Sequence, residues 1–284
     1  MLRFLVLFRR MLWVFQFTES RSEEISSPCN QYKKGITEIL TSLRPQFLTE
    51  VPMKVLAING SPHMDRGNTA LILQPLLEGM KDAGAEVDLF YSRNLNIQPC
   101  IGDLSCWIKH PGECAQKDDM QILYPKFRAA EALVFASPVY YAGVTGSLKN
   151  LIDRMLPLHS FAQGKDVRRQ KVVLVSTCAA WEMEMFKPLL VQFEAICPKT
   201  EDSSMQLAGA LLRPHAHSLK PMLHGNSRSL AEDVLKAARQ AGTELATENS
   251  ISQKTLERVS QELMAKDAYE KAMQEWFLHP GDSM

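Results

Sequence analysis

Three closely spaced cysteines are the residues of this sequence whose type and spacing most directly suggest chemistry. Cys100, Cys106 and Cys114 lie in one short stretch, whereas the other three cysteines are scattered along the chain. Grouped thiolates can hold iron or zinc or take part in redox reactions. Six cysteines in 284 residues are too few for a disulfide scaffold. The pattern therefore indicates a metal or redox site in a reducing compartment, and we expect a cytoplasmic protein.

A second candidate site is the loop that follows a short apolar run. The loop from Gly60 to Thr69 contains two glycines and several polar side chains, and it leads into a helical pattern. Such a loop can present backbone N–H groups to a phosphate at a helix N-terminus. It is neither a Walker A loop nor a dinucleotide fingerprint, because no Lys-Ser/Thr pair follows Gly67 and G-x-G-x-x-G is absent. Capping of the helix by Asn68 or Thr69 explains the loop equally well.

Two further loops carry residues that suit a flat ligand. Residues 137–147 place Tyr140 and Tyr141 beside two glycines, and aromatic side chains next to exposed backbone amides suit a polar-edged ring such as a flavin. The simpler alternative is that one tyrosine packs into the core. Residues 176–180 begin with Ser176 and Thr177 and have small side chains, which let a ligand approach closely. Three such loops would form a binding site if the fold brought them together.

Five short runs are typical of buried strands and would position these loops. They alternate with helical patterns and lie at 54–59, 86–91, 132–136, 171–175 and 206–212. Strands separated by helices predict an α/β fold with right-handed crossovers and a parallel sheet covered on both faces. Ligands of such sheets bind outside the carboxyl ends of the strands. The three loops are therefore expected to meet at one edge.

The two ends of the chain differ from this α/β region. Arg9 and Arg10 divide an apolar stretch into halves too short to span a membrane, and no secretory cleavage site follows. We interpret residues 1–52 as an appendage, with Met53 as the natural first residue; a membrane-surface anchor or a partner-binding helix is the alternative. Residues 53–213 form the predicted core domain. Residues 214–284 form a helical extension packed on the core or on a partner subunit, with Gly242 ending its first helix.

The charge balance excludes one class of partner. The chain has 32 Lys and Arg residues against 32 Asp and Glu residues, so its formal net charge is zero. Proteins that bind nucleic acid carry a basic footprint, which neutralises the phosphates. We therefore expect no nucleic-acid partner.

Five short motifs follow one another between residues 53 and 180. They are Gly60-Ser61-Pro62, Gly67-Asn68-Thr69, Asp118-Asp119-Met120, Ser137-Pro138-Val139-Tyr140 and Leu148-Lys149-Asn150-Leu151-Ile152-Asp153-Arg154. In this order they resemble the NADPH-dependent FMN reductase family, in the branch related to the iron–sulfur flavoproteins. The resemblance implies a flavodoxin-like sheet of five parallel strands in the order 2-1-3-4-5, bound FMN, and NAD(P)H as co-substrate.

The resemblance also implies roles for residues in these motifs. Polar residues of the first loop would surround the FMN phosphate, and residues 138–143 would lie along the isoalloxazine ring. The predicted cofactor-binding set is Ser61, Arg66, Asn68, Thr69, Pro138, Val139, Tyr140, Tyr141, Gly143, Ser176 and Thr177. Lys149, Asp153 and Arg154 recur in such proteins, and we expect them on the polar face of a helix, in an ion pair or a subunit contact.

The cysteine stretch departs from the family pattern. It resembles the compact four-cysteine motif of the iron–sulfur flavoproteins, but Asp103 occupies the position of the second cysteine. A carboxylate is a harder and weaker ligand for iron than a thiolate, which disfavours a cluster held by Cys100, Cys106 and Cys114. Zinc held by these thiolates with Asp103 or His110 is an alternative. The remaining interpretation is a substrate-side or dimer-contact loop with unliganded cysteines.

These features predict an FMN-dependent NAD(P)H oxidoreductase. Electrons would pass from a nicotinamide through FMN to a quinone, a flavin or a similar small acceptor, and no catalytic side chain would be required because the cofactor carries the chemistry. An iron–sulfur flavoprotein-type electron-transfer protein and a non-catalytic flavin-binding protein are the alternatives. A homodimer is expected, because a partner commonly covers the open face of the flavin.

Overall fold

The computed structural model describes residues 52–159, 169–200, 203–225 and 228–278. They belong to a compact unit that begins at Pro52. The predicted appendage, apart from Pro52, lies outside the described residues. None of the described helices combines the length and the apolar composition needed to cross a membrane.

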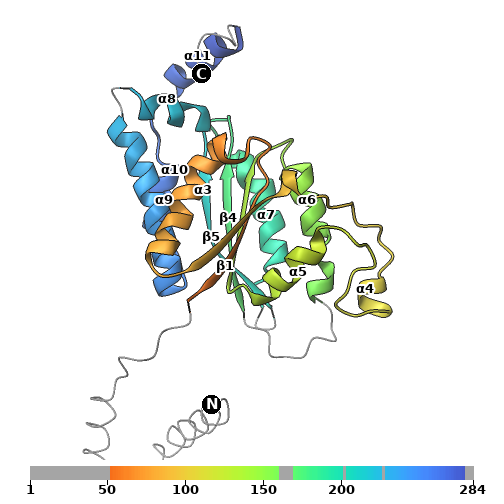
Figure 1. Cartoon of the computed structure of the whole chain (residues 1–284). Helices are drawn as coiled ribbons and strands as arrows, with labels where there is room; N and C mark the ends of the chain where they lie inside the picture. The colour runs from red at the N-terminus through yellow and green to blue at the C-terminus, as the bar shows by residue number, and fades with distance from the viewer. Residues whose placement is uncertain (1–51, 160–168, 201–202, 226–227, 279–284) are drawn as a thin grey trace, which may run out of the picture. The chain divides into compact units, whose positions relative to one another are not determined.

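Five parallel strands form one sheet in the order β2-β1-β3-β4-β5, which confirms the predicted fold class (Figure 1). The strands are β1 (Lys54–Asn59), β2 (Glu86–Tyr91), β3 (Ala132–Pro138), β4 (Gln170–Thr177) and β5 (Met205–Arg213). The central strands are nearly continuous runs of buried apolar side chains, as expected for a sheet covered on both faces. β2 lies at the edge and has no fully buried residue.

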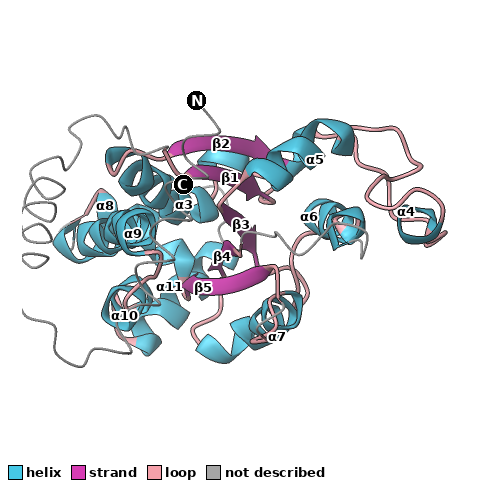
Figure 2. Ribbon diagram, turned by 90° about the horizontal axis from the view of Figure 1, so that it is seen from below, coloured by secondary structure: helices cyan, strands magenta, loops and turns pink. Residues whose placement is uncertain are grey.

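Helices cover both faces of the sheet (Figure 2). Val55 and Ala57 of β1 point to one hydrophobic core, formed with α3, α8, α9 and α10. Leu56 and Ile58 point to the other core, formed with α5, α6 and α7. The bounds of these helices are α3 (Asn68–Asp82), α5 (Met120–Ala129), α6 (Gly146–Asp153), α7 (Lys187–Ile196), α8 (Leu219–Leu223), α9 (Arg228–Glu248) and α10 (Gln253–Ser260).

Two glycines let α3 and α9 pack with their backbones almost in contact. A Cβ atom built on Gly79 would lie 1.9 Å from the carbonyl oxygen of Arg239, and one built on Gly242 would lie 2.0 Å from that of Leu76. The expectation that Gly242 ends a helix was therefore wrong. Gly242 lies inside α9 because only a residue without a side chain fits against α3.

The remaining described helices lie at the periphery. α4 (Ser105–Ile108) lies in the long loop between β2 and α5, which extends away from the sheet (Figures 1 and 2). α11 (Lys266–Leu278) is the last described helix. Short 3-10 turns supplement these helices: η1 (Met64–Arg66), η2 (Ser92–Asn94), η3 (Leu156–His159), η4 (Met183–Phe186) and η5 (Ala216–Ser218).

Candidate functional site

The loop after β1 leads into α3, whose N-terminus lies at the carboxyl edge of the sheet and has no side-chain cap. The N-cap of α3 is Gly67, which has no side chain to accept from the first N–H groups, and Asn68 and Thr69 lie inside the helix. The capping alternative is therefore wrong. A Cβ atom on Gly67 would lie 2.9 Å from the Ser61 hydroxyl oxygen, so a larger residue would crowd this turn. Uncapped N–H groups together with the helix dipole suit an anion such as a phosphate.

Hydrogen bonds within the protein hold this loop in shape. The Ser61 N–H donates to the Asn59 side-chain oxygen at 2.8 Å, and the Asn59 amide donates to the Met64 carbonyl at 3.1 Å. The Thr145 hydroxyl, from the loop after β3, donates to the Gly60 carbonyl at 2.7 Å. Asn59, Ser61 and Thr145 are all buried, so these hydrogen bonds fix the shape of the loop.

A pair of hydroxyl groups joins the first loop to the loop after β4. The oxygens of Thr69 and Thr177 are 2.8 Å apart, and both residues are buried. One hydroxyl donates to the other, so one of the two protons stays available for another acceptor. The Ser176 hydroxyl donates instead to the Ser137 carbonyl at 2.8 Å, a bond within the sheet edge.

The tyrosines of the loop after β3 lie at the surface. Tyr140 and Gly143 exchange backbone hydrogen bonds of 2.9 and 3.0 Å, and Tyr141 and Ala142 between them have positive φ values of 47° and 62°. This is the geometry of a type I′ turn, which non-glycine residues adopt at some cost. Tyr140 is half exposed and Tyr141 fully exposed, so the alternative that one of them packs into the core was wrong.

The other predicted residues flank the same edge. Pro138 and Val139 are half-buried, and the Val139 N–H donates to the Thr177 carbonyl at 2.8 Å. Arg66 is exposed on η1 and forms no ion pair among the described residues. The structure therefore brings the three predicted loops together at the carboxyl ends of β1, β3 and β4.

Arg154 lies in a buried ion pair that the sequence did not reveal. Its guanidinium donates twice to Asp118, at 2.7 and 3.1 Å, and once to the Gln98 carbonyl at 2.8 Å. Its side chain is 1% exposed, so the prediction that Arg154 lies on a helix surface was wrong. The helix ends at Asp153, and the chain then turns Arg154 inward. Lys149 and Asp153 do form the expected surface ion pair, at 2.6 Å.

The environment of Asp118 keeps it charged. Burial by itself would raise the pKa of this carboxyl group. Hydrogen bonds from Arg154 and from the backbone N–H groups of Gln98 and Met120, together with the Arg154 charge, outweigh burial and hold the pKa below its usual range. The Asp118–Arg154 ion pair joins the cysteine-bearing loop to the end of α6.

The cysteines do not assemble into a metal site in the described part of the chain. Cys100 is exposed, Cys106 buried and Cys114 half-buried, and no three side chains of His, Cys, Asp or Glu converge there. Burial and the neighbouring Cys114 raise the pKa of the Cys106 thiol. The Asp103 carboxylate instead accepts from the Ser105 N–H at 3.4 Å. As placed, these residues do not fit a cluster.

The fold is that of a flavodoxin-like α/β protein, and the uncapped N-terminus of α3 and the three loops lie at the carboxyl edge of its sheet. Residues 53–194, half of the chain, match the model of the NADPH-dependent FMN reductase family. The chain belongs to this family.

Curated relatives are similar to about a third to a half of the chain. An iron–sulfur flavoprotein of Archaeoglobus fulgidus is 40% identical over 102 residues, which are 36% of this chain and 48% of the relative. One of Methanocaldococcus jannaschii is 37% identical over 106 residues, 37% of this chain and 53% of the relative. The NAD(P)H-dependent FMN-containing oxidoreductase YwqN of Bacillus subtilis is 29% identical over 150 residues, 51% of this chain and 77% of YwqN. The match spans only about half the length of the two iron–sulfur flavoproteins.

Proposed function

We propose that this protein binds FMN at the carboxyl edge of the sheet and oxidises NAD(P)H, passing the electrons to a small acceptor such as a quinone or a flavin. The observation that carries the proposal is the uncapped start of α3, which lies beside the loops after β3 and β4. An FMN phosphate would supply the acceptor that these N–H groups lack. Family membership supports FMN as the ligand and NAD(P)H as the reductant.

In this proposal the side chains bind and orient, and the cofactor carries the reaction. Bound FMN supplies a two-electron centre that takes a hydride and gives up electrons to an acceptor. Ser61, Asn68 and Thr69 would hold the phosphate, with Arg66 as a nearby cation. Residues 138–143, Tyr140 among them, would lie along the flavin ring. No protein nucleophile or general base is needed.

We also propose a cytoplasmic homodimer. The five cysteines among the described residues are all unpaired, as expected in a reducing compartment. Tyr140 and Tyr141 leave an exposed aromatic rim beside the proposed flavin position, and a second subunit would cover it.

An anaerobic absorbance spectrum of the purified full chain, recorded before and after NADPH and with iron assayed alongside, tests the proposal. We expect a flavin spectrum that bleaches on reduction, with no stoichiometric iron. Iron together with a broad absorbance shoulder would support the electron-transfer alternative, which the names of the relatives favour. Flavin that NADPH does not bleach would indicate a binding protein. A protein that neither contains nor takes up FMN would refute the assignment.

Replacing Thr69 with valine should weaken FMN binding about tenfold. The change keeps the shape of the side chain but removes a hydroxyl that can donate to a charged phosphate oxygen. FMN affinity can be measured by fluorescence titration of the apoprotein. Thr69→Ser, which keeps the hydroxyl, is the matched control and should bind as the wild type does. Equal affinities of the valine variant and the wild type would remove Thr69 from the phosphate site.

A further inference from the structure

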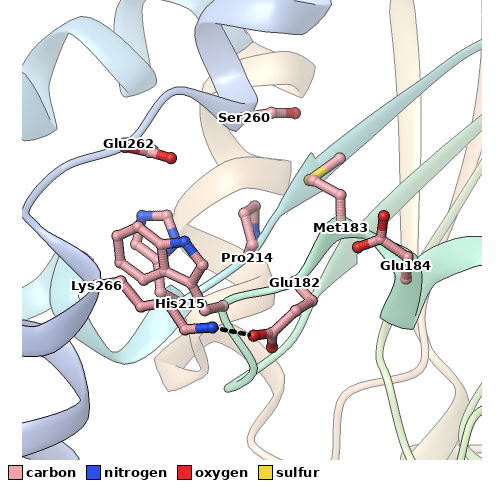
Figure 3. A pocket seen from close by; sticks show the side chains of 9 residues that line it. Glu182, Met183, Glu184, Pro214, His215, Ser260, Glu262 and Lys266 are labelled. Atoms are coloured by element: carbon pink, nitrogen blue, oxygen red, sulfur yellow. Dashed lines mark hydrogen bonds and ion pairs between the residues drawn. The ribbon is translucent and has the colours of Figure 1, made fainter.

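A pocket of about 460 Å³ lies beyond the loop that follows β4 (Figure 3). Three separate segments of the chain form its walls: the end of the β4 loop, the turn after β5, and the connection from α10 to α11. Its lining residues are Trp181, Glu182, Met183, Glu184, Pro214, His215, Ser260, Glu262 and Lys266. Five of these nine residues lie outside residues 53–194, so the pocket is formed partly by a region that the family match does not cover.

One wall of the pocket is a rigid aromatic stack. The rings of Trp181 and His215 are stacked with their centroids 4.3 Å apart, and Tyr269 packs against both at 5.8 and 5.7 Å. The Tyr269 hydroxyl donates to the Ala179 carbonyl at 2.5 Å, which fixes α11 to the β4 loop. Trp181 is only partly buried, so its indole offers a preformed surface to a planar ligand.

The His215 ring of the stack is itself uncharged at neutral pH. His215 is 1% exposed, and burial together with the Arg213 charge lowers its pKa to about 3. Arg213 is fully buried, and its donors reach the carbonyls of Pro214 and Val259 and the His215 ring. Because the guanidinium is fully buried, Arg213 makes no direct contact with a ligand in the pocket.

The rest of the lining is acidic. Lys266 pairs with Glu182 at 2.6 Å, which neutralises both charges. Glu184 and Glu262 are exposed and have no ion pair among the described residues. In the view of Figure 3 they lie on opposite sides of the pocket. Two unpaired carboxylates beside an indole attract a cation and repel an anion, because both the charges and the ring face favour positive charge.

We propose that this pocket binds a small planar aromatic cation of the pyridinium type. The ligand would stack on Trp181, and Glu184 and Glu262 would balance its charge. The same carboxylates disfavour a phosphate-bearing ligand such as FMN in this pocket. The site is distinct from the proposed phosphate site at α3, and its occupancy does not depend on flavin.

Isothermal titration of the full-length protein, as purified, with three ligands of the same ring tests this assignment. They are 1-methylnicotinamide, which is a cation, nicotinamide, which is neutral, and nicotinate, which is an anion. We expect the cation to bind at least tenfold more tightly than nicotinamide, and nicotinate to show no binding. Equal affinities for the cation and the neutral ring, or no binding of the cation at millimolar concentration, would overturn the proposal.

Variants then locate the binding. The double variant Glu184→Gln/Glu262→Gln should bind 1-methylnicotinamide about tenfold more weakly and lose its preference over nicotinamide. Trp181→Ala should weaken binding of both rings. Glu194→Gln changes an exposed glutamate of α7 outside the pocket and serves as the matched control, with unchanged affinity. Full retention of the cation preference in the double variant would contradict the site even if the Trp181 variant failed to fold.

Discussion

Replacing Arg154 with methionine should lower the free energy of unfolding by about 3–5 kcal/mol, because it leaves the Asp118 carboxylate buried without its partner. The side chain of Asp118 is 4% exposed, and the two hydrogen bonds from Arg154 are its main charged contacts. Urea denaturation of the wild type and the variant at pH 7 measures the difference. Lys149→Met removes the cation of the exposed pair on α6, the helix that precedes Arg154, and as the matched control it should cost less than about 1 kcal/mol.

The same pair predicts how that difference depends on pH. In the wild type the pKa of Asp118 lies below its usual range, so the stabilisation is present above the unfolded-state pKa of about 3.9 and is lost as the pH falls through the folded-state value. Without Arg154, burial raises the pKa of Asp118. The difference in stability should therefore shrink once the pH falls below the variant's raised pKa. A difference that stays constant down to pH 3 would show that lost packing, and not the charge pair, causes the effect.

Replacing Gly242 with alanine should destabilise the protein by about 3 kcal/mol, at the upper end of the range for overpacking. The added Cβ would lie 2.0 Å from a backbone oxygen of α3, and a backbone atom cannot turn aside as a flexible side chain can. The two helices would have to separate, which would open the core between them. Thermal and urea unfolding measure the loss.

Gly146→Ala is the matched control for that change. Gly146 is the first residue of α6, and a Cβ built on it meets nothing within 4 Å. Alanine there should leave stability unchanged or raise it slightly, because it reduces the freedom of the unfolded chain. If both alanine variants behaved alike, the close contact between α3 and α9 would not be a determinant of stability.

The strands were predictable because each carries its own signal. β1 and β2 have the predicted bounds, and β3, β4 and β5 extend the predicted runs by one or two residues at their ends. A strand buried on both faces must be apolar throughout, so local sequence suffices to locate it. The helices of the C-terminal part were located less well. Gly242 has the appearance of a helix end, and only the neighbouring α3 explains why it lies inside α9.

The sequence predicts which loops form the site, but it does not predict the side-chain contacts between them. The loops after β1, β3 and β4 were placed at one edge by the topology of parallel strands. The pairing of Thr69 with Thr177, 108 positions apart, depends on tertiary contact. The same holds for Arg154, whose partner Asp118 lies 36 positions away and whose neighbour Asp153 faces solvent. No spacing rule connects such residues.

The close glycine contact between α3 and α9 joins the region that matches the family model to the C-terminal part of the chain. The family match ends at residue 194, whereas α9 begins at Arg228. α3 begins at the proposed phosphate site, and its second half rests on α9. A protein shortened after β5 would keep every predicted FMN residue, yet it would leave one side of α3 and of the sheet open to water. The proposed phosphate site thus depends on packing against α9, which lies beyond the residues that match the family model.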